Sequence, residues 1–382
     1  MSLKPLTHKL KVRLKFIDMA RSIAILLMLE GHFIDNSLLL EARDPNNMIY
    51  AIWSFMRHFT APIFLTVTGL IFVYLLLKER DKIISQNIRF KKGLKRIGEL
   101  IIWGFIVQYN AFHVLECIAV GIFAILLIFT VYKFIKFIPL WSYFFIAAIV
   151  NFSLFPIVSK MHLGMSYPEA IWLSASTLFH SDSNIIILFP TVPFVGFTMF
   201  GAMIGALIHD LNKYIKKFYF PLAFALIGVS FYFFSPSILG TIDVALESIF
   251  TSTDFQIAGL RRLYEKVGMV LIFLSILMYI DYFWGAKIKS KSLFLKIGQN
   301  TLTIYVLHML LLYMLVDFLG LTDSLRKSLS PWESAIGAIG FILLFVLLIK
   351  YLETAKSSLG KLLDWTRIAI NFIFDRLKNK IT

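Results

Sequence analysis

The amino-acid sequence predicts an all-α, polytopic membrane protein with about ten transmembrane helices and with both termini in the cytoplasm. Hydrophobic residues make up 58% of the 382 residues and charged residues only 16%, whereas a soluble domain is about half apolar and about a quarter charged. Apolar stretches long enough to cross a bilayer recur along the whole chain. Lys and Arg gather in every second segment between these stretches, which is the pattern of cytoplasmic loops.

The same composition excludes several other classes. Intrinsic disorder requires low hydrophobicity, and a disulfide scaffold requires paired cysteines, whereas Cys117 is the only cysteine. The formal net charge of +15 is explained by the loops, so we predict no nucleic-acid partner. We predict no metal site, because the sequence contains neither a C-x-x-C pair nor an H-E-x-x-H motif.

The predicted elements follow from stretches of about 20 mainly apolar residues. In chain order, the spans are about 16–40, 49–77, 94–110, 111–132, 139–158, 185–208, 218–236, 266–284, 298–320 and 332–353. Alternation from a cytoplasmic N-terminus places inside the basic segments 1–15, 78–96, 133–136, 213–217, 287–296 and 350–380. The chain therefore divides into a basic N-terminal segment (1–15), a transmembrane domain (16–353) and an amphipathic cytoplasmic tail (354–382).

The first predicted span carries ionisable side chains, which are costly in a membrane and usually functional. Asp18, Arg21, His32 and Asp35 recur at helical spacing, so one stripe of the helix carries all four. Arg21 lies near the cytoplasmic end, and His32 lies about three turns, or roughly 16 Å, further out. Glu30 lies on a different face. An imidazole titrates near neutral pH and can take a proton from a hydroxyl or an amine, so His32 is the candidate general base.

Other predicted spans place ionisable groups at a similar depth. A polar chamber in the outer half of the membrane would solvate them together with Glu30 and His32. The second, fourth and ninth spans carry, respectively, Arg57 with His58, His113 with Glu116, and Tyr305 with His308.

Most of these groups also have a simpler structural interpretation. A buried histidine such as His113 or His308 often only bonds a neighbouring helix, an interaction worth about 1 kcal/mol or less. Arg57 could neutralise Glu30 or Glu116, because buried charges are usually paired. Positive charge in the inner loops follows from the positive-inside rule alone.

Prolines and glycines predict how some spans are shaped. Pro62 removes a backbone donor and predicts a kink in the second span. Pro190 and Pro193 predict a broken sixth span. Gly201 and Gly205 form a G-x-x-x-G spacing, which predicts close helix packing rather than chemistry.

Four segments resemble, in order, motifs of membrane-bound acyltransferases, and the closest branch is the bacterial relatives of heparan-α-glucosaminide N-acetyltransferase. The hallmark of this superfamily is an arginine, ten residues and a histidine, a spacing that Arg21 and His32 match. Ser22 stands where glycine is usual, and residues 41–48 lack the histidine of the N-acetyltransferase, which favours O-acyl transfer. The matching segments are 16–32, 59–69, 114–119 and 298–308.

The resemblance implies acyl transfer from cytoplasmic acyl-CoA, usually acetyl-CoA, to a saccharide hydroxyl or amine outside the bacterial cytoplasmic membrane. The expected partners are acyl-CoA, a glycan acceptor and membrane lipids. Arg21 would orient the thioester and His32 would act as general base, with either direct transfer or an acyl-histidine intermediate. The other predicted catalytic residues are Glu30, His58, Glu116 and His308; the predicted substrate-binding residues are Arg57, His113 and Tyr305; Arg89, Lys92, Arg96 and Lys291 are predicted to bind acyl-CoA phosphates.

Two non-enzymatic functions compete with this interpretation. A transporter or a lipid or glycan flippase also uses mid-membrane histidines and broken helices. A structural subunit of a polysaccharide export complex is the third hypothesis. Binding of acetyl-CoA discriminates among them, because a ligand of the folded state raises its stability.

Overall fold

The computed structural model describes residues 14–107, 111–155, 186–249, 257–289, 292–315, 319 and 325–351. Most of the predicted basic segment 1–15, the whole predicted tail 354–382 and Lys291 lie outside the described residues.

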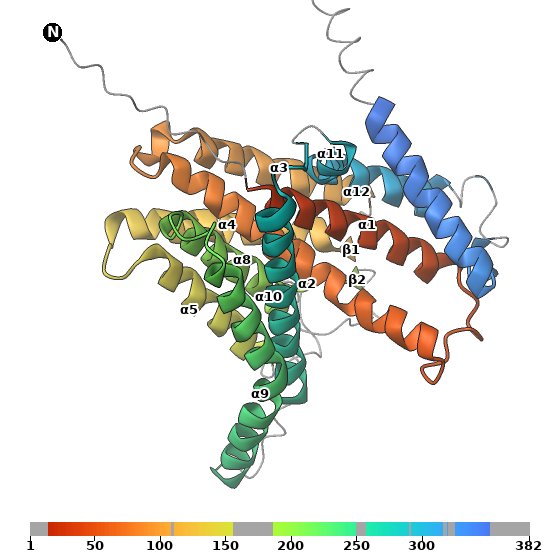
Figure 1. The fold of residues 1–382 in the computed structure, drawn as a ribbon, viewed down its shortest axis with the longest axis horizontal. Helices are drawn as coiled ribbons and strands as arrows, with labels where there is room; N and C mark the ends of the chain where they lie inside the picture. Colours follow the sequence, from red (N-terminus) through yellow and green to blue (C-terminus); the bar gives the residue numbers. More distant parts are fainter. Residues whose placement is uncertain are drawn as a thin grey trace, which may run out of the picture.

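The described residues form a helical assembly (Figure 1). In chain order, the long helices are α1 (Lys15–Ser37), α2 (Met48–Leu76), α3 (Ile88–Val107), α4 (Val114–Phe134), α5 (Leu140–Ser153), α8 (Thr191–Asp210), α9 (Tyr219–Ile249), α10 (Ile257–Trp284) and a final helix, Pro331–Tyr351. Shorter elements are the 3-10 turns η1 (Leu77–Glu79) and η2 (Ile84–Gln86), the helices α11 (Leu293–Gln299) and α12 (Thr301–Met309), and the π-helix η3 (Leu310–Leu315).

The described helices support a membrane protein. Five of them are long and apolar enough to cross a bilayer: Met48–Glu79, Val114–Phe134, Thr191–Asp210, Arg261–Trp284 and Pro331–Tyr351. Each predicted span contains at least part of a described helix, but the number of ten spans and the orientation of the termini stay predictions.

The final helix shows how the outside of the molecule suits lipid. Its Ile336, Ile339, Leu343 and Leu347 are spaced by three or four residues and are between 49% and 68% exposed. Water would make such an apolar stripe unfavourable, whereas lipid tails solvate it. The exposed stripe therefore favours a membrane-embedded position for this helix.

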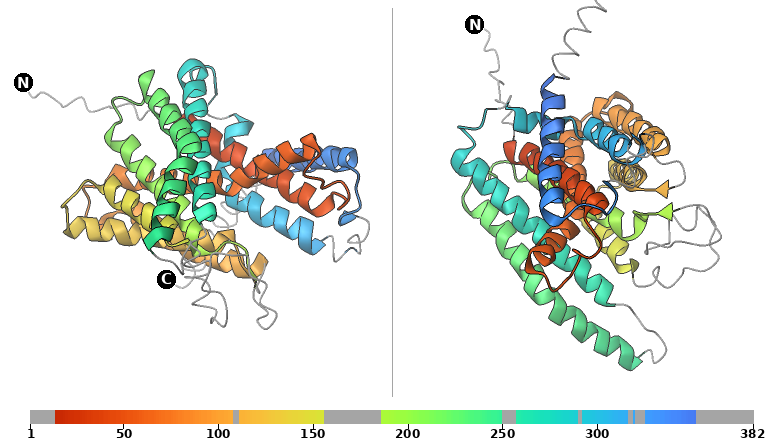
Figure 2. Two further views of the ribbon diagram at one scale, coloured as in Figure 1. Left: turned by 90° about the horizontal axis from the view of Figure 1, so that it is seen from below. Right: turned by 90° about the vertical axis from the view of Figure 1, so that its right-hand side faces the viewer.

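The structure corrects one expectation about the extent of the helices. The predicted outer loop 237–265 is largely helical, because α9 continues to Ile249 and α10 begins at Ile257; the two form a long hairpin that projects beyond the other helices (Figures 1 and 2). The helical content supports the all-α fold class, and one short strand, β1 (Ala111–Phe112), pairs in parallel with another, β2 (Ile186–Ile187). The break expected near Pro190 and Pro193 is present at the start of α8, where Val192 has non-helical backbone angles. α2 runs through Pro62 as one helix, and the kink expected there stays a prediction.

Glycines bring α2 and α8 into backbone contact. A Cβ on Gly69 would collide with the backbone of Thr198, and a Cβ on Gly201 would collide with the backbone of Thr66. A Cβ on Gly205 would likewise collide with the Leu70 carbonyl. The G-x-x-x-G pair is thus a packing feature, as predicted.

α1 lies at the centre of the arrangement that carries the predicted site (Figure 2). It packs against α2, α10, α11 and α12. At its first residue, the Lys15 ammonium donates to the carbonyls of Gly285 (2.6 Å) and Ile288 (2.7 Å). Beyond its last turn, the Leu39 amide donates to the Leu329 carbonyl at 2.9 Å. Both ends of α1 are therefore fixed to distant parts of the chain.

Candidate functional site

A cavity of about 380 Å³, the basic cavity, lies between α2, α3 and α4 and is closed by α1, α11 and α12. It follows α3 from Arg89 to Leu100, a distance of about 16 Å at the rise of an α-helix. Its walls are mostly apolar side chains of α2 and α4. An elongated apolar cavity with a few charged groups is the usual form of a small-molecule site.

One stretch of the basic cavity is positively charged. Arg89, Lys92 and Arg96 line it, and their spacing of three and four residues puts them on one face of α3. Arg96 is partly neutralised by Glu99, at 3.3 Å. The structure thus brings together three of the four predicted phosphate-binding residues, and the fourth, Lys291, lies outside the described residues.

Arg21 enters the basic cavity from α1. Its Nη2 donates to the Thr301 hydroxyl at the start of α12, at 3.3 Å. The next residue, Ser22, joins α1 to α11: its Oγ accepts from the Gly298 amide (3.0 Å) and lies 2.6 Å from the Phe294 carbonyl. Ser22 therefore holds the Arg21 turn against the helix pair that also carries Tyr305 and His308.

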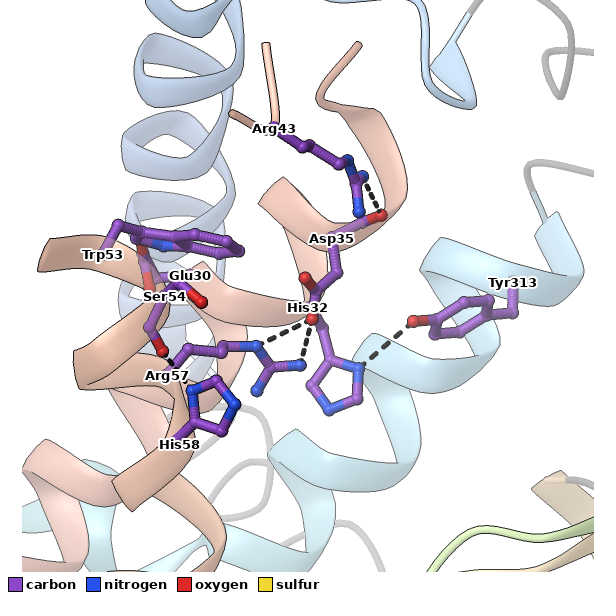
Figure 3. Close-up of polar contacts among 9 residues, drawn as sticks. All are labelled: Glu30, His32, Asp35, Arg43, Trp53, Ser54, Arg57, His58 and Tyr313. Carbon is purple, nitrogen blue, oxygen red and sulfur yellow. Dashed lines mark hydrogen bonds and ion pairs between the residues drawn. The ribbon is translucent and has the colours of Figure 1, made fainter. Parts of the chain in front are cut away.

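Two imidazoles follow Tyr305 away from the basic cavity. Tyr305 lines that cavity, and its ring centroid lies 5.1 Å from that of His308. The His308 ring is fully buried, and its centroid lies 5.2 Å from that of His32. His32 Nδ1 in turn lies 3.2 Å from the Tyr313 hydroxyl (Figure 3). Tyr305, His308, His32 and Tyr313 form a row that joins α12 and η3 to α1.

The hydrogen bonds fix the proton position on His308. Its Nδ1 lies 3.1 Å from the Ile304 carbonyl, which can only accept, so Nδ1 carries the hydrogen. Nε2 is therefore the unprotonated nitrogen of the neutral ring. It has no hydrogen-bond partner among the described residues. A buried lone pair beside His32 is a chemically available proton acceptor.

His113 and Glu116 form a pair that caps α4. His113 Nδ1 lies 2.9 Å from the Glu116 carboxylate and accepts from the Leu115 amide at 3.3 Å. The Glu116 carboxylate accepts from the His113 amide at 3.2 Å, which completes a capping box. Gly104 of α3 leaves room for this carboxylate. Glu116, a predicted catalytic residue, therefore faces His113 and α3, whereas Tyr313 is the group that faces His32 Nδ1.

His113 nevertheless belongs to the same surroundings as the row of rings. Its centroid lies 6.1 Å from that of Tyr305, and its Nε2 is buried without a hydrogen-bond partner among the described residues. Contacts through Tyr305 thus connect His113 of α4 with His308 of α12 and His32 of α1, and the polar chamber around them stays a prediction.

The remaining predicted site residues form a second cluster between α1 and α2 (Figure 3). Arg57 binds the Asp35 carboxylate through two nitrogens, with Nε at 2.7 Å. The Trp53 indole donates to Glu30 at 2.7 Å. The ion-pair partner of Arg57 is thus Asp35, and not Glu30 or Glu116, the two acids that the sequence suggested.

Gly31 allows the Arg57 side chain to cross α1 next to His32. A Cβ at Gly31 would lie 2.7 Å from Arg57 Cδ. His58, the following residue on α2, is exposed, and its Nδ1 lies 2.5 Å from the Ser54 carbonyl. His58 therefore belongs to the outside of this cluster, and its Nδ1 is directed to its own helix.

Tyr313 is the site residue that sequence reasoning missed. In an α-helix, a residue five positions after His308 lies on a different face. The π-helix η3, Leu310–Leu315, has i→i+5 hydrogen bonding and so brings Tyr313 back toward the side of His308 and His32. Nothing in the residue pattern predicts this turn, although π-turns often occur at functional sites.

The comparison with known proteins identifies one family. A family model described as an acyltransferase domain matches residues 14–350. No curated protein and no solved structure matches the chain. The matched range contains α1 through the final helix and therefore every described residue of both clusters.

Proposed function

Because the chain belongs to this acyltransferase family, we propose that it moves an acyl group, most simply acetyl, from cytoplasmic acyl-CoA to a hydroxyl or an amine of an extracytoplasmic saccharide. The apolar helices support a membrane protein. The proposed location is the cytoplasmic membrane of a bacterium, where the donor is inside and the glycan acceptor is outside.

The observation that carries the proposal is the course of the basic cavity. It begins at Arg89, Lys92 and Arg96, which suit the phosphates of CoA. It is lined by apolar side chains, which suit the arm that bears the thioester, and it reaches Tyr305, the first ring of the row that leads to His32. Arg21 lies along this course, where its guanidinium would orient the donor.

The proposed chemistry uses the nitrogen atoms of His32 and His308. We assign the hydrogen of the neutral His32 ring to Nδ1, which lies 3.2 Å from the Tyr313 hydroxyl, so that His32 Nε2 accepts the proton of the attacking hydroxyl or amine. The acceptor atom forms a bond to the thioester carbonyl carbon, the carbon–sulfur bond breaks, and the thiolate of CoA takes up the proton. Such proton transfer typically accelerates a reaction by about 100- to 10,000-fold.

His308 supports this step through position. Its unprotonated Nε2 is buried beside His32, so it can take the proton from His32 and return it to the leaving thiolate on the side of the basic cavity. If an acyl-histidine intermediate forms instead, His32 Nε2 is the nucleophile that would carry the acyl group.

Donor binding tests the proposal. Acetyl-CoA should raise the unfolding temperature of the purified protein, because it binds only the folded state. Lys92→Ala combined with Arg96→Ala should weaken acetyl-CoA binding by about 10-fold or more, since each lost charge-assisted bond is worth about 1.5–3 kcal/mol.

Lys91→Ala combined with Lys95→Ala provides the matched control. It removes two cations from the same helix, but neither residue lines the basic cavity. Affinity for acetyl-CoA should stay unchanged in this variant. The proposal is wrong if acetyl-CoA causes no shift in the wild type, which is also the result that a transporter or flippase predicts, or if both double variants lose affinity equally.

A further inference from the structure

A second cavity, the outer cavity, has a volume of about 650 Å³ and lies between α2 and the α9–α10 hairpin. The first three turns of α2 form one wall, and Tyr232, Arg262, Glu265 and Lys266 form the other. In the predicted topology, the start of α2 and the tip of the hairpin both face outward, opposite to the basic residues of α3.

The outer cavity concentrates positive charge where positive charge is scarce. The predicted outer segments hold few Lys and Arg residues, yet Arg43, Arg262 and Lys266 all line this cavity. Arg262 and Lys266 lie one turn apart on α10, so their like charges repel unless an anion lies between them. Charge that is brought together against the positive-inside bias needs a functional reason.

Nearby acidic groups do not cancel this charge among the described residues. Glu265 is the acidic residue of the lining, and it accepts a bond from Arg261, which does not line the cavity, at 3.2 Å. The Arg43 guanidinium donates to the carbonyls of Asp35 (2.7 Å) and Leu38 (3.1 Å), which are neutral partners. The cavity therefore keeps a net positive charge and favours an anionic ligand.

Aromatic rings share the same walls. Tyr50, Phe55, Phe59 and Tyr232 line the outer cavity together with the cations. Rings supply flat apolar faces, and the Tyr hydroxyls add polar contacts at their edges. Such a mixture suits a sugar ring that carries a charged substituent better than it suits a lipid tail or a simple ion.

The outer cavity lies beside the cluster that leads to His32. His58 lines it. The preceding residue, Arg57, crosses α1 at Gly31, the neighbour of His32, and binds Asp35 (Figure 3). His58 thus links the outer cavity to the turn of α2 whose Arg57 crosses α1 beside His32.

We propose that the outer cavity binds the acceptor and that the acceptor is an anionic saccharide, whose phosphate or carboxylate is held by Arg262 and Lys266 while its ring packs on the aromatic wall. This inference rests on the proposed function, because it assigns the acceptor side of the same reaction. It adds a substrate class and two binding residues that the sequence analysis did not single out.

The test measures binding of three probes to the purified full-length protein by saturation-transfer NMR: glucose 1-phosphate, glucuronate and glucose. Glucose 1-phosphate, glucuronate or both should bind more tightly than glucose, and added salt should weaken that binding. Whichever anion binds identifies phosphate or carboxylate as the recognised group.

Variants identify the residues. Arg262→Gln combined with Lys266→Gln should weaken binding of the anionic sugar by about 10-fold or more. Arg326→Gln combined with Lys327→Gln is the matched control, since it removes two other predicted outer cations that do not line the cavity, and it should bind like the wild type. Both variants should keep the acetyl-CoA-induced rise in unfolding temperature, which shows that they fold.

Several outcomes overturn the inference. It fails if neither anionic sugar binds better than glucose, or if the Arg262 and Lys266 variant binds as tightly as its control. It also fails if nanodiscs of phosphatidylglycerol, but not of phosphatidylcholine, abolish sugar binding, since a lipid headgroup is then the occupant. If anionic sugars bind through Arg262 and Lys266 but acetyl-CoA does not bind the wild type, the anionic site stands and the proposed acyl transfer is wrong.

Discussion

At the scale of single residues, His32 is held by groups from another part of the chain. Tyr313 faces its Nδ1 at 3.2 Å, and the buried His308 ring lies against its side. The tautomer of an imidazole is set by the hydrogen bond that its other nitrogen makes. In the proposed mechanism, Tyr313 accepts a hydrogen bond from His32 Nδ1, which leaves Nε2 to accept a proton.

Two substitutions separate the proposed base from the residue that positions it. His32→Ala should abolish acetyl transfer in membrane vesicles supplied with labelled acetyl-CoA, since the general base is removed. Tyr313→Phe should slow transfer by only about fivefold, the effect of one hydrogen bond worth about 1 kcal/mol.

Both variants should keep acetyl-CoA binding, because neither residue lines the basic cavity. Tyr351→Phe, at an exposed tyrosine at the end of the final helix, is the control and should leave transfer unchanged. Full activity in His32→Ala would rule out the mechanism, and full activity in Tyr313→Phe would rule out the positioning role.

For single residues, the sequence predicted some of the side-chain placements but not all of the pairings. The spacing of Arg21 and His32 predicts one face, and the structure places both against α12. The partner of Arg57 was not predictable, because Asp35, Glu30 and Glu116 are all plausible acids at a similar depth. Arg57 pairs with Asp35 because its side chain crosses α1 at Gly31, and only the structure shows this crossing.

At the scale of elements, the contact between α2 and α8 depends on glycine. The backbone of one helix occupies the space where a Cβ of the other would lie, at Gly69 and at Gly201. Small residues are the means by which membrane helices approach closely. This contact holds α2, which forms walls of both cavities, in its place.

Gly201→Ala should lower the unfolding temperature in detergent, because the added Cβ meets the Thr66 backbone, which cannot move aside like a flexible side chain. Overpacking typically costs about 1–3 kcal/mol. Gly98→Ala on α3 is the matched control, since nothing lies within 4 Å of the position that its Cβ would take, and it should be neutral or slightly stabilising. Equal unfolding temperatures of the two variants would contradict the claim that Gly201 is needed for close packing of α2 on α8.

Apolar length predicted where helices occur but not where they end. α9 continues through residues 237–249, beyond the predicted end of its span at residue 236, and it packs against α10. Hydropathy likewise could not predict the π-helix η3, since Leu310–Leu315 is as apolar as the α-helix before it.

At the scale of the whole molecule, the predicted orientation puts the basic cavity inside and the outer cavity outside. Cys117 is the only cysteine and is fully buried, so the wild-type protein should resist a membrane-impermeant maleimide. Asp44→Cys, between α1 and α2, should react in intact cells. Lys95→Cys on α3 should react only after the membrane is opened.

This labelling pattern follows from the positive-inside distribution of Lys and Arg. Labelling of Lys95→Cys in intact cells, or protection of Asp44→Cys, would reverse the orientation. Either result would also place the proposed donor and acceptor cavities on the wrong sides of the membrane.

The sequence by itself determined that the chain is a helical membrane protein, which residues are ionisable within its helices, and that Arg21 and His32 share a face, because each depends on composition or on helical period. Only the tertiary structure decided which of those groups meet. Tyr313, Asp35, Arg262 and Lys266 acquire their roles from helices that are distant in sequence, and the angle at which two helices cross depends on packing at glycines and turns that hydropathy does not encode.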